Sequence, residues 1–125
     1  MKKLTISIDF DGVLNDSEYP EIGEIDSGKI RIIRDWIDRG HTVIFNSCRP
    51  TDIIEKVLKP YFMFGRACYS YFNSSTHENI EKFGDETRKI YADVYIDDHN
   101  ILQIGQPIDF EEYDNIIRRI ERGDK

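Results

Sequence analysis

Residues 4–14 read LTISIDFDGVL. The first five residues are mostly apolar and β-branched, which is typical of a buried parallel strand, and the run stops at Asp9. A second carboxylate, Asp11, follows two positions later, and Gly12 then allows a sharp turn of the backbone. Aspartates also occur as ordinary turn or cap residues. Because open α/β sheets bind ligands at the carboxyl ends of their strands, we interpret the two acids as part of a catalytic edge.

The length and the charge of the chain limit its class. With 125 residues it is expected to form one domain, and its net charge of −7 weighs against binding duplex DNA, which favours a basic face. The apolar run before Asp9 is too short for a signal peptide or a membrane span. Together with only two cysteines, Cys48 and Cys68, this predicts a cytoplasmic protein with free thiols and no membrane contact.

Strand-like and helix-like segments alternate along the chain. Apolar, β-branched runs predict strands at residues 4–8, 42–45, 67–72 and 91–96. Amphipathic periodicity predicts helices at residues 28–39, 51–58, 76–83 and from 109 to about 120. This alternation predicts an α/β fold: a Rossmann-like three-layer sandwich with helices on both faces of a mainly parallel sheet of four to five strands.

Local signals set the expected ends and faces of the helices. Gly40 is expected to end the first helix and Pro60 the second, and Ser75–Glu78 fits a capping box for the third. The first helix is expected to bury Ile30, Ile33, Trp36 and Ile37, and the last to bury Tyr113, Ile116, Ile117 and Ile120. His41 and His77 are expected to be structural or exposed.

Polar residues follow three of the four predicted strands. They are Asp9 with Asp11, then Ser47, and finally Asp97 with Asp98. Two carboxylates 4 Å apart repel each other by about 1 kcal/mol in water and by about 4 kcal/mol at an effective dielectric constant of 20. A positive group must offset this repulsion. Oxygen ligands of this kind suit Mg²⁺, and Lys82 or Lys89 can supply further positive charge.

The order of these groups resembles the four-motif series of the haloacid dehalogenase-like (HAD) phosphatases. The first motif, D-x-D-x-[TV], is matched by Asp9-Phe10-Asp11-Gly12-Val13, and a Ser, a Lys and an Asp-Asp pair follow in the family's order. The resemblance covers most of the chain. The segments 9–14, 19–23, 47–49 and 88–98 are similar, more narrowly, to small HAD hydrolases of bacteria and their viruses.

This resemblance implies a Mg²⁺-dependent phosphomonoester hydrolase. Asp9 would be the nucleophile that forms an aspartyl-phosphate, Asp11 the general acid and base, and Ser47 a hydrogen-bond donor to the phosphoryl group. The site lysine would be Lys89, which is preferred over Lys82. The implied metal ligands are Asp9, Asp11, Asp97 and Asp98, and the implied substrate-binding residues are Gly12, Ser47, Cys48 and Arg49.

The intervals between the motifs are filled by core elements, so no cap domain is expected and the site should be open. The substrate would be a phosphorylated small molecule or the phosphorylated end of a macromolecule, and the acidic charge disfavours a nucleic acid. An alternative to an open site is a homo-oligomer in which a neighbouring subunit covers it.

Rival interpretations use the same residues. The chain is alternatively a catalytically weak or inactive phosphate- or Mg²⁺-binding module of HAD fold, or a receiver-like signalling domain. The position of the acidic pairs on the first and fourth strands disfavours the receiver. Arg49 is as well explained by an ion pair as by contact with a substrate phosphate. For His99, a solvated loop residue is preferred over contact with the leaving group. Cys48 lacks the Cys-x₅-Arg loop of a thiol phosphatase.

Overall fold

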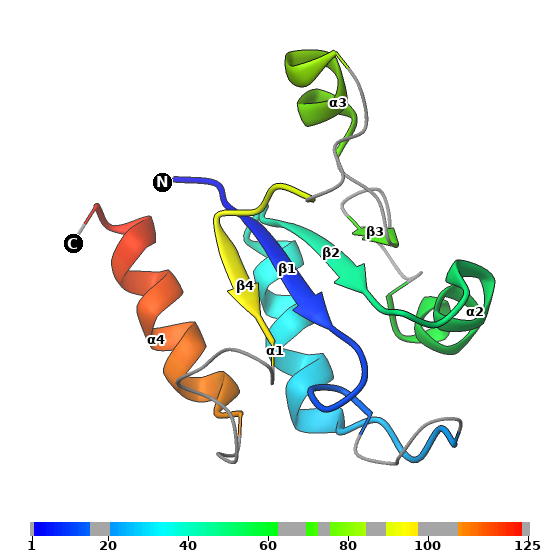
Figure 1. The fold of residues 1–125 in the computed structure, drawn as a ribbon. Helices are drawn as coiled ribbons and strands as arrows, with labels where there is room; N and C mark the ends of the chain where they lie inside the picture. Colours follow the sequence, from blue (N-terminus) through cyan, green and yellow to red (C-terminus); the bar gives the residue numbers. More distant parts are fainter. Residues whose placement is uncertain are drawn as a thin grey trace.

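The protein is described from a computed structural model, which covers residues 2–15, 21–62, 70–72, 76–84, 90–97 and 108–123. Four parallel strands form one open sheet in the order β3-β2-β1-β4 (Figure 1). Their bounds are β1 Thr5–Asp9, β2 Thr42–Asn46, β3 Ser70–Phe72 and β4 Val94–Ile96. The predicted α/β class with a parallel sheet is therefore confirmed.

The register of the sheet fixes where its strands end. In β1, Asp9 pairs with Asn46 of β2, and Ile8 pairs with Ile96 of β4. All three strands run in the same direction, so the residues that follow these pairs leave the sheet at one edge. That edge lies at the arrowheads of β1 and β4 in Figure 1.

Four helices accompany the strands in the described ranges: α1 Ser27–Asp38, α2 Thr51–Phe62, α3 His77–Phe83 and α4 Phe110–Glu121. In Figure 1, α1 crosses behind the sheet, whereas α3 lies beyond the ends at which the strands begin. The rings of Trp36 in α1 and Phe110 in α4 stack with their centroids 5.7 Å apart, so these two helices pack together. None of the helices in the described ranges is long and apolar enough to cross a membrane.

The core lies between β1, β2 and the helices. Fully buried side chains include Ile6 and Ile8 of β1, Phe45 of β2 and Ile33 and Trp36 of α1. The buried stripe predicted for the first helix is confirmed, because its four members Ile30, Ile33, Trp36 and Ile37 are all buried. Asp26 caps α1 by accepting from the amides of Gly28 and Lys29, and Gly40 follows the helix with a φ of 96°.

The predicted end of the second helix was wrong. Pro60 does not close it, because α2 continues to Phe62 with the proline inside its last turn. Proline removes one backbone donor from a helix, and tertiary packing offsets this loss here. Phe62 is buried, and its ring lies 5.1 Å from that of Phe45, centroid to centroid. The contact holds the final turn against the sheet.

Three smaller corrections concern ends and faces. Thr76 caps α3, accepting from the amide of Asn79, so the cap lies one residue later than the expected box at Ser75. On α4, Ile117 is fully buried but Ile116 is 40% exposed, so Ile116 is not part of the buried face. The fourth strand begins at Val94 and not at residue 91. Of the predicted third strand, residues 67–69 lie outside the described ranges.

Side-chain bonds explain why β4 starts late. The hydroxyl of Tyr95 accepts from the amide of Ala92 and donates to the carbonyl of Ile90, so these two backbone groups bond to a side chain and not to a neighbouring strand. Asp93 meets β1 by donating its amide to the carbonyl of Thr5, and its carboxylate accepts from the amide of Thr5.

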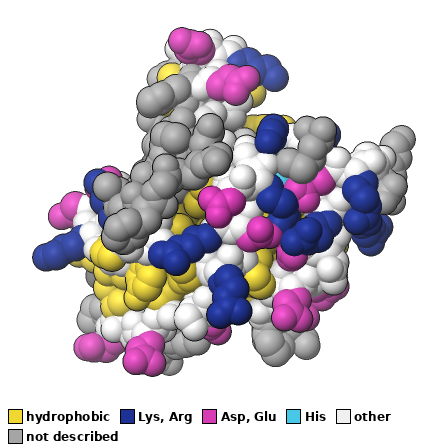
Figure 2. All heavy atoms as spheres, turned by 180° about the vertical axis from the view of Figure 1, so that it is seen from behind, with side chains coloured by type: hydrophobic (Ala, Val, Ile, Leu, Met, Phe, Trp, Pro, Cys, Tyr) yellow, Lys and Arg dark blue, Asp and Glu magenta, His cyan; other side chains and the backbone are white. Residues whose placement is uncertain are grey.

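A polar network joins α1, α4 and the start of β2. Arg39 donates to Asp35, Asp114 and Glu121, and Trp36 donates to Asp114 from its indole nitrogen. Figure 2 shows basic and acidic side chains interspersed on the face seen from behind, where α1 lies. Such a network uses charges to connect two helices that are far apart in sequence.

His41 is fully buried in this network. Its Nδ1 accepts from the amide of Leu4 at 3.0 Å, which assigns the ring proton to Nε2, and Nε2 lies 3.0 Å from Oε2 of Glu121. His41 is thus a structural group, as expected, whereas the side chain of His77 lies outside what the structure describes.

Candidate active site

Two of the predicted acids follow residues that are paired across the sheet. Asp9 follows Ile8, Asp97 follows Ile96, and Ile8 pairs with Ile96 in neighbouring parallel strands. Neighbouring strands lie about 4.8 Å apart. The acids from the beginning and the end of the chain therefore leave the sheet at the same edge and in the same register.

The loop after β1 holds Asp11 in a fixed turn. The carbonyl of Phe10 accepts from the amides of Val13, Leu14 and Asn15, and the amide of Gly12 donates to the carbonyl of Asn15 at 2.9 Å. Gly12 has a φ of 83°, a left-handed conformation that favours glycine. The side chain of Asp11 projects from this turn and is 34% exposed.

The carboxylate of Asp11 is paired with Arg49. The Nε of Arg49 lies 3.1 and 3.0 Å from the two carboxylate oxygens, and its Nη2 lies 2.9 Å from Oδ1. Only 4% of the Arg49 side chain is exposed, and its guanidinium carbon lies 5.8 Å from the centroid of the Phe10 ring. The sequence left two roles open for Arg49, and the structure shows the ion pair, with Asp11 as the partner.

These contacts change the proton affinity of Asp11. Burial raises the pKa of its carboxyl group, but hydrogen bonds from Arg49, Asn15 and Ser47 and the charge of Arg49 outweigh burial. The net pKa lies below the ordinary value of 3.8. Asp11 is therefore a carboxylate at neutral pH in this conformation.

Ser47 lies directly after β2, beside this pair. Its hydroxyl oxygen accepts from the amide of Arg49 at 2.9 Å, and the hydroxyl also hydrogen-bonds to Asp11. Cys48 is exposed and free. The segment 47–49 thus brings a hydroxyl, a thiol and a guanidinium to the edge where Asp9 and Asp97 emerge.

The candidate lysines and the second acid of the last pair are only partly described. Lys82 is on α3, where its Nζ lies 5.6 Å from the ring centroid of Phe83. In Figure 1 this helix is at the end of the sheet opposite the arrowheads, so Lys82 is not brought to Asp9. The predicted site residues Lys89 and Asp98 lie outside the described ranges. The same is true of His99, whose role the sequence analysis discussed.

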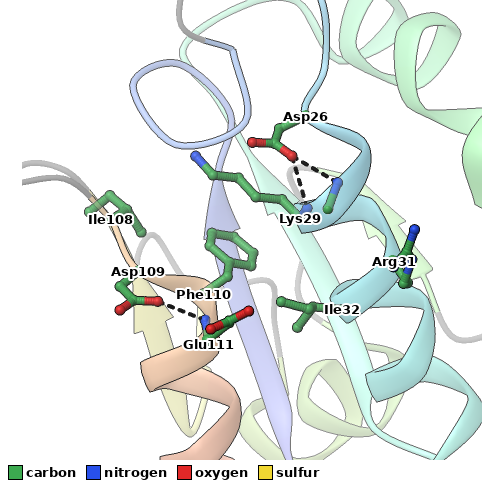
Figure 3. Close-up of a pocket in the computed structure, with 9 residues that line it drawn as sticks. Asp26, Lys29, Arg31, Ile32, Ile108, Asp109, Phe110 and Glu111 are labelled. Carbon is green, nitrogen blue, oxygen red and sulfur yellow. Dashed lines mark hydrogen bonds between the residues drawn. The ribbon is translucent and has the colours of Figure 1, made fainter.

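A pocket of about 360 Å³ lies between the starts of α1 and α4 (Figure 3). Lys29 extends along it, with its Nζ donating to the carbonyl of Val13 at 2.6 Å and lying 5.5 Å from the ring centroid of Phe110. Asp9, Asp11, Ser47 and Asp97 are not among its lining residues, which are Asp26, Gly28, Lys29, Arg31, Ile32, Ile108, Asp109, Phe110 and Glu111. The pocket and the cluster of acids are therefore separate features.

The donor set at the sheet edge fits a hard cation in part. Mg²⁺ is typically bound by one or two carboxylates together with water and substrate phosphate. Asp9 and Asp97 can supply the two carboxylates. Within the described ranges, no group of three or more Asp, Glu, His or Cys side chains gathers as a metal-binding set. The carboxylate of Asp11 is held by Arg49, so it does not add a third acid to Asp9 and Asp97 in this conformation.

The sequence analysis missed one residue of the cluster. Asn15 is fully buried, and its amide nitrogen donates to Oδ1 of Asp11 at 3.0 Å and to the carbonyl of Glu21 at 3.1 Å. Only its place four residues after Asp11, within a loop, is visible in the sequence, and this spacing predicts no contact in a non-helical segment.

Comparison with known proteins supports the fold. No protein-family model matches the chain, and no curated protein matches it. The chain is similar to the solved structure of a conserved protein from Bacteroides thetaiotaomicron, with 26% identity, a TM-score of 0.69, and coverage of 94% of this chain and 92% of that one. The likeness spans nearly the whole of both chains.

Proposed function

We propose that this chain is a Mg²⁺-dependent phosphomonoester hydrolase of the HAD type, with a capless Rossmann-like fold. The observation that carries the proposal is the register of β1 and β4, because Asp9 and Asp97 follow the paired residues Ile8 and Ile96. Asp11, Ser47 and Arg49 lie at the same edge of the sheet. These groups supply a nucleophile, a proton carrier and phosphate-binding donors.

The proposed metal ligands are the carboxylates of Asp9, Asp97 and Asp98 and the backbone carbonyl of Asp11. A bound Mg²⁺ would neutralise charge on the phosphoryl oxygens and allow the carboxylates to lie close together. The side chains of this chain supply the nucleophile, the proton transfers and the contacts with the phosphoryl group.

In the first half of the reaction, a carboxylate oxygen of Asp9 attacks phosphorus. An O–P bond forms to Asp9, the P–O bond to the substrate alcohol breaks, and Asp11 gives a proton to the departing oxygen. Ser47, Gly12, Cys48 and Arg49 would surround the phosphoryl group, and Lys89 would offset its charge.

In the second half, water attacks the aspartyl-phosphate and Asp11 accepts its proton. The O–P bond to Asp9 then breaks and releases inorganic phosphate. The lowered pKa of Asp11 keeps the carboxylate ionised and ready to accept a proton, although it also makes the group a weaker base. The acid role requires more, because protonation removes the negative charge of Asp11 and weakens its pairing with the guanidinium of Arg49.

The partner in this proposal is a phosphorylated small molecule or the phosphorylated end of a macromolecule. An open, capless edge admits either, and the negative net charge disfavours a nucleic acid.

A second candidate is a phosphate- or Mg²⁺-binding module of the same fold without turnover. The ion pair between Arg49 and Asp11 favours it, because the expected proton donor is held ionised. Both candidates use the same ligands but differ in whether a covalent intermediate forms.

Turnover of p-nitrophenyl phosphate with Mg²⁺ separates the two. The hydrolase releases phosphate and forms an acid-stable, hydroxylamine-sensitive phosphoenzyme, and Asp9→Asn abolishes both. Asp38→Asn, an exposed acid at the end of α1, is the matched control and should retain activity. Absence of turnover across a panel of phosphomonoesters, with Mg²⁺ still bound, would favour the binding module.

A further inference from the structure

Asn15 is fully buried at the centre of a polar cluster in which Asp11 is partly exposed and Glu21 is exposed. In addition to its bonds to Asp11 and Glu21, its Oδ1 accepts from the amide of Gly23 at 2.9 Å. The amide group thus uses both of its hydrogens and an acceptor site at a position with no exposed surface. A buried side chain satisfied in this way has little freedom to rotate.

Arg49 reaches the same two partners from another part of the chain. Its Nη2 donates to the carbonyl of Glu21 at 2.9 Å, and its guanidinium holds both oxygens of Asp11. Asp11 and the carbonyl of Glu21 each accept from Asn15 and from Arg49. We call these four residues, Asp11, Asn15, Glu21 and Arg49, the carboxylate clamp.

The clamp joins three segments: the turn after β1, the segment Glu21–Gly23 and the loop after β2. Two donors from different segments fix the plane and the rotation of one carboxylate. Proton transfer depends on such placement, since a displacement of about 1 Å at a reacting group can cost 10²-fold in rate.

We propose that Asn15 is a positioning residue, assisted by Arg49, that orients the carboxylate of Asp11 toward the leaving group and fastens Glu21–Gly23 against the same site. This inference rests on the proposed hydrolase activity for its catalytic part. It assigns a role to Asn15, and it makes the segment Glu21–Gly23 part of the site.

Leaving groups of different quality test the catalytic part. Asn15→Asp keeps the size and the acceptor for Gly23 but loses the donors to Asp11 and Glu21. We expect it to lower kcat/KM for an alkyl phosphate on the order of 10²-fold, the usual contribution of a general acid, because kcat/KM reports the half-reaction in which the leaving group departs. The loss should be much smaller for p-nitrophenyl phosphate, because nitrophenolate departs without a proton.

Arg49→Lys provides a second variant that keeps the charge and removes the planar fork. Because Arg49 is also a proposed phosphate-binding residue, this variant should lower kcat/KM for both substrates, and more for the alkyl phosphate. Asn115→Asp and Arg119→Lys make the same changes on exposed positions of α4 and should leave both substrates unaffected. Equal losses of kcat/KM for the two substrates in Asn15→Asp would overturn the positioning role, since a purely structural defect does not distinguish leaving groups.

Hydrogen exchange tests the carboxylate clamp by a measurement that does not depend on enzymatic activity. The amide of Gly23 should exchange slowly in the unmodified protein and in Asn15→Asp, and faster in Asn15→Leu, whereas amides of the core strand β2 should not change in any variant. Unchanged exchange of Gly23 in a folded Asn15→Leu would overturn the clamp. Absence of turnover in the unmodified protein would instead overturn the proposed function, and the exchange result would still decide whether Asn15 holds this segment.

Discussion

Ile8 and Ile96 lie side by side in neighbouring parallel strands, although they are 88 positions apart in the chain. Each is followed by an aspartate, so the sheet brings Asp9 and Asp97 to one edge. This relationship connects the fold with the proposed chemistry, and the predictions about the site depend on it.

The first prediction concerns Ser47. Ser47→Ala should lower kcat/KM for phosphomonoesters by about 10²-fold, which is typical for removal of one donor to a developing negative charge. The change also removes the hydroxyl contacts to Asp11 and to the amide of Arg49. Ser47→Thr keeps the hydroxyl and should retain most of the activity. Steady-state kinetics checks this, and equal activity of the Ala variant would contradict a role for the hydroxyl.

The second prediction concerns Mg²⁺. A cation that binds only the folded state stabilises it by about 2.7 kcal/mol at 100 times its Kd, so Tm should rise in millimolar Mg²⁺. Asp97→Asn should reduce this rise by removing one ligand, whereas the exposed control Asp38→Asn should not. Differential scanning fluorimetry with and without Mg²⁺ measures the shift. If Tm stays constant in the unmodified protein, the proposed metal site is wrong.

The third prediction concerns stability in acid. Burial raises the pKa values of Asp114 and Glu121, but hydrogen bonds outweigh it, and both lie below their ordinary values of 3.8 and 4.5. Arg39 donates to both groups, with Trp36 and Arg118 also facing Asp114 and His41 facing Glu121. Folding thus favours the ionised form of both groups. The stability that they give to the folded state is present above about pH 4.5 and is lost as the pH falls further.

Urea unfolding at pH 7 and pH 3 measures this loss. Arg39→Gln should be less stable at pH 7 and should show a smaller difference between the two pH values, because the pKa values of its partners return toward ordinary ones. Arg31→Gln, at an exposed position of α1, is the matched control. The same pH dependence in Arg39→Gln and in the unmodified protein would contradict the assignment.

The fourth prediction concerns Trp36. Trp36→Phe removes the indole donor that lies 2.9 Å from Asp114, and it leaves space in the stack with Phe110. Because Trp36 is fully buried, we expect a loss of about 1–3 kcal/mol in the free energy of unfolding. Phe83→Leu changes an aromatic residue that is 50% exposed and should shift stability by less than about 0.5 kcal/mol. Urea denaturation compares the two, and a neutral Trp36→Phe would show that the bond to Asp114 adds nothing.

Local patterns predicted most of the elements. The apolar runs before Asp9 and Asn46 and the spacing of Ile30, Ile33 and Ile37 act over a few residues, and they led to the correct strands and helix. One error arose where a distant contact outweighs a local signal, because Pro60 remains inside α2 while Phe62 packs on Phe45. The late start of the fourth strand has a local cause, because the hydroxyl of Tyr95 bonds to Ala92 and Ile90, three and five positions before it.

The sequence by itself determined which acids, hydroxyls and glycines follow the strands, because those features depend on spacing along the chain. Only the tertiary structure decided that the guanidinium of Arg49 holds Asp11, 38 positions away, and that Asn15 and Glu21 join them. The physical reason is that such pairing depends on β2 lying beside β1 and on the lack of water around a buried guanidinium. A buried charge requires a partner, and the fold determines which carboxylate is near enough to provide it.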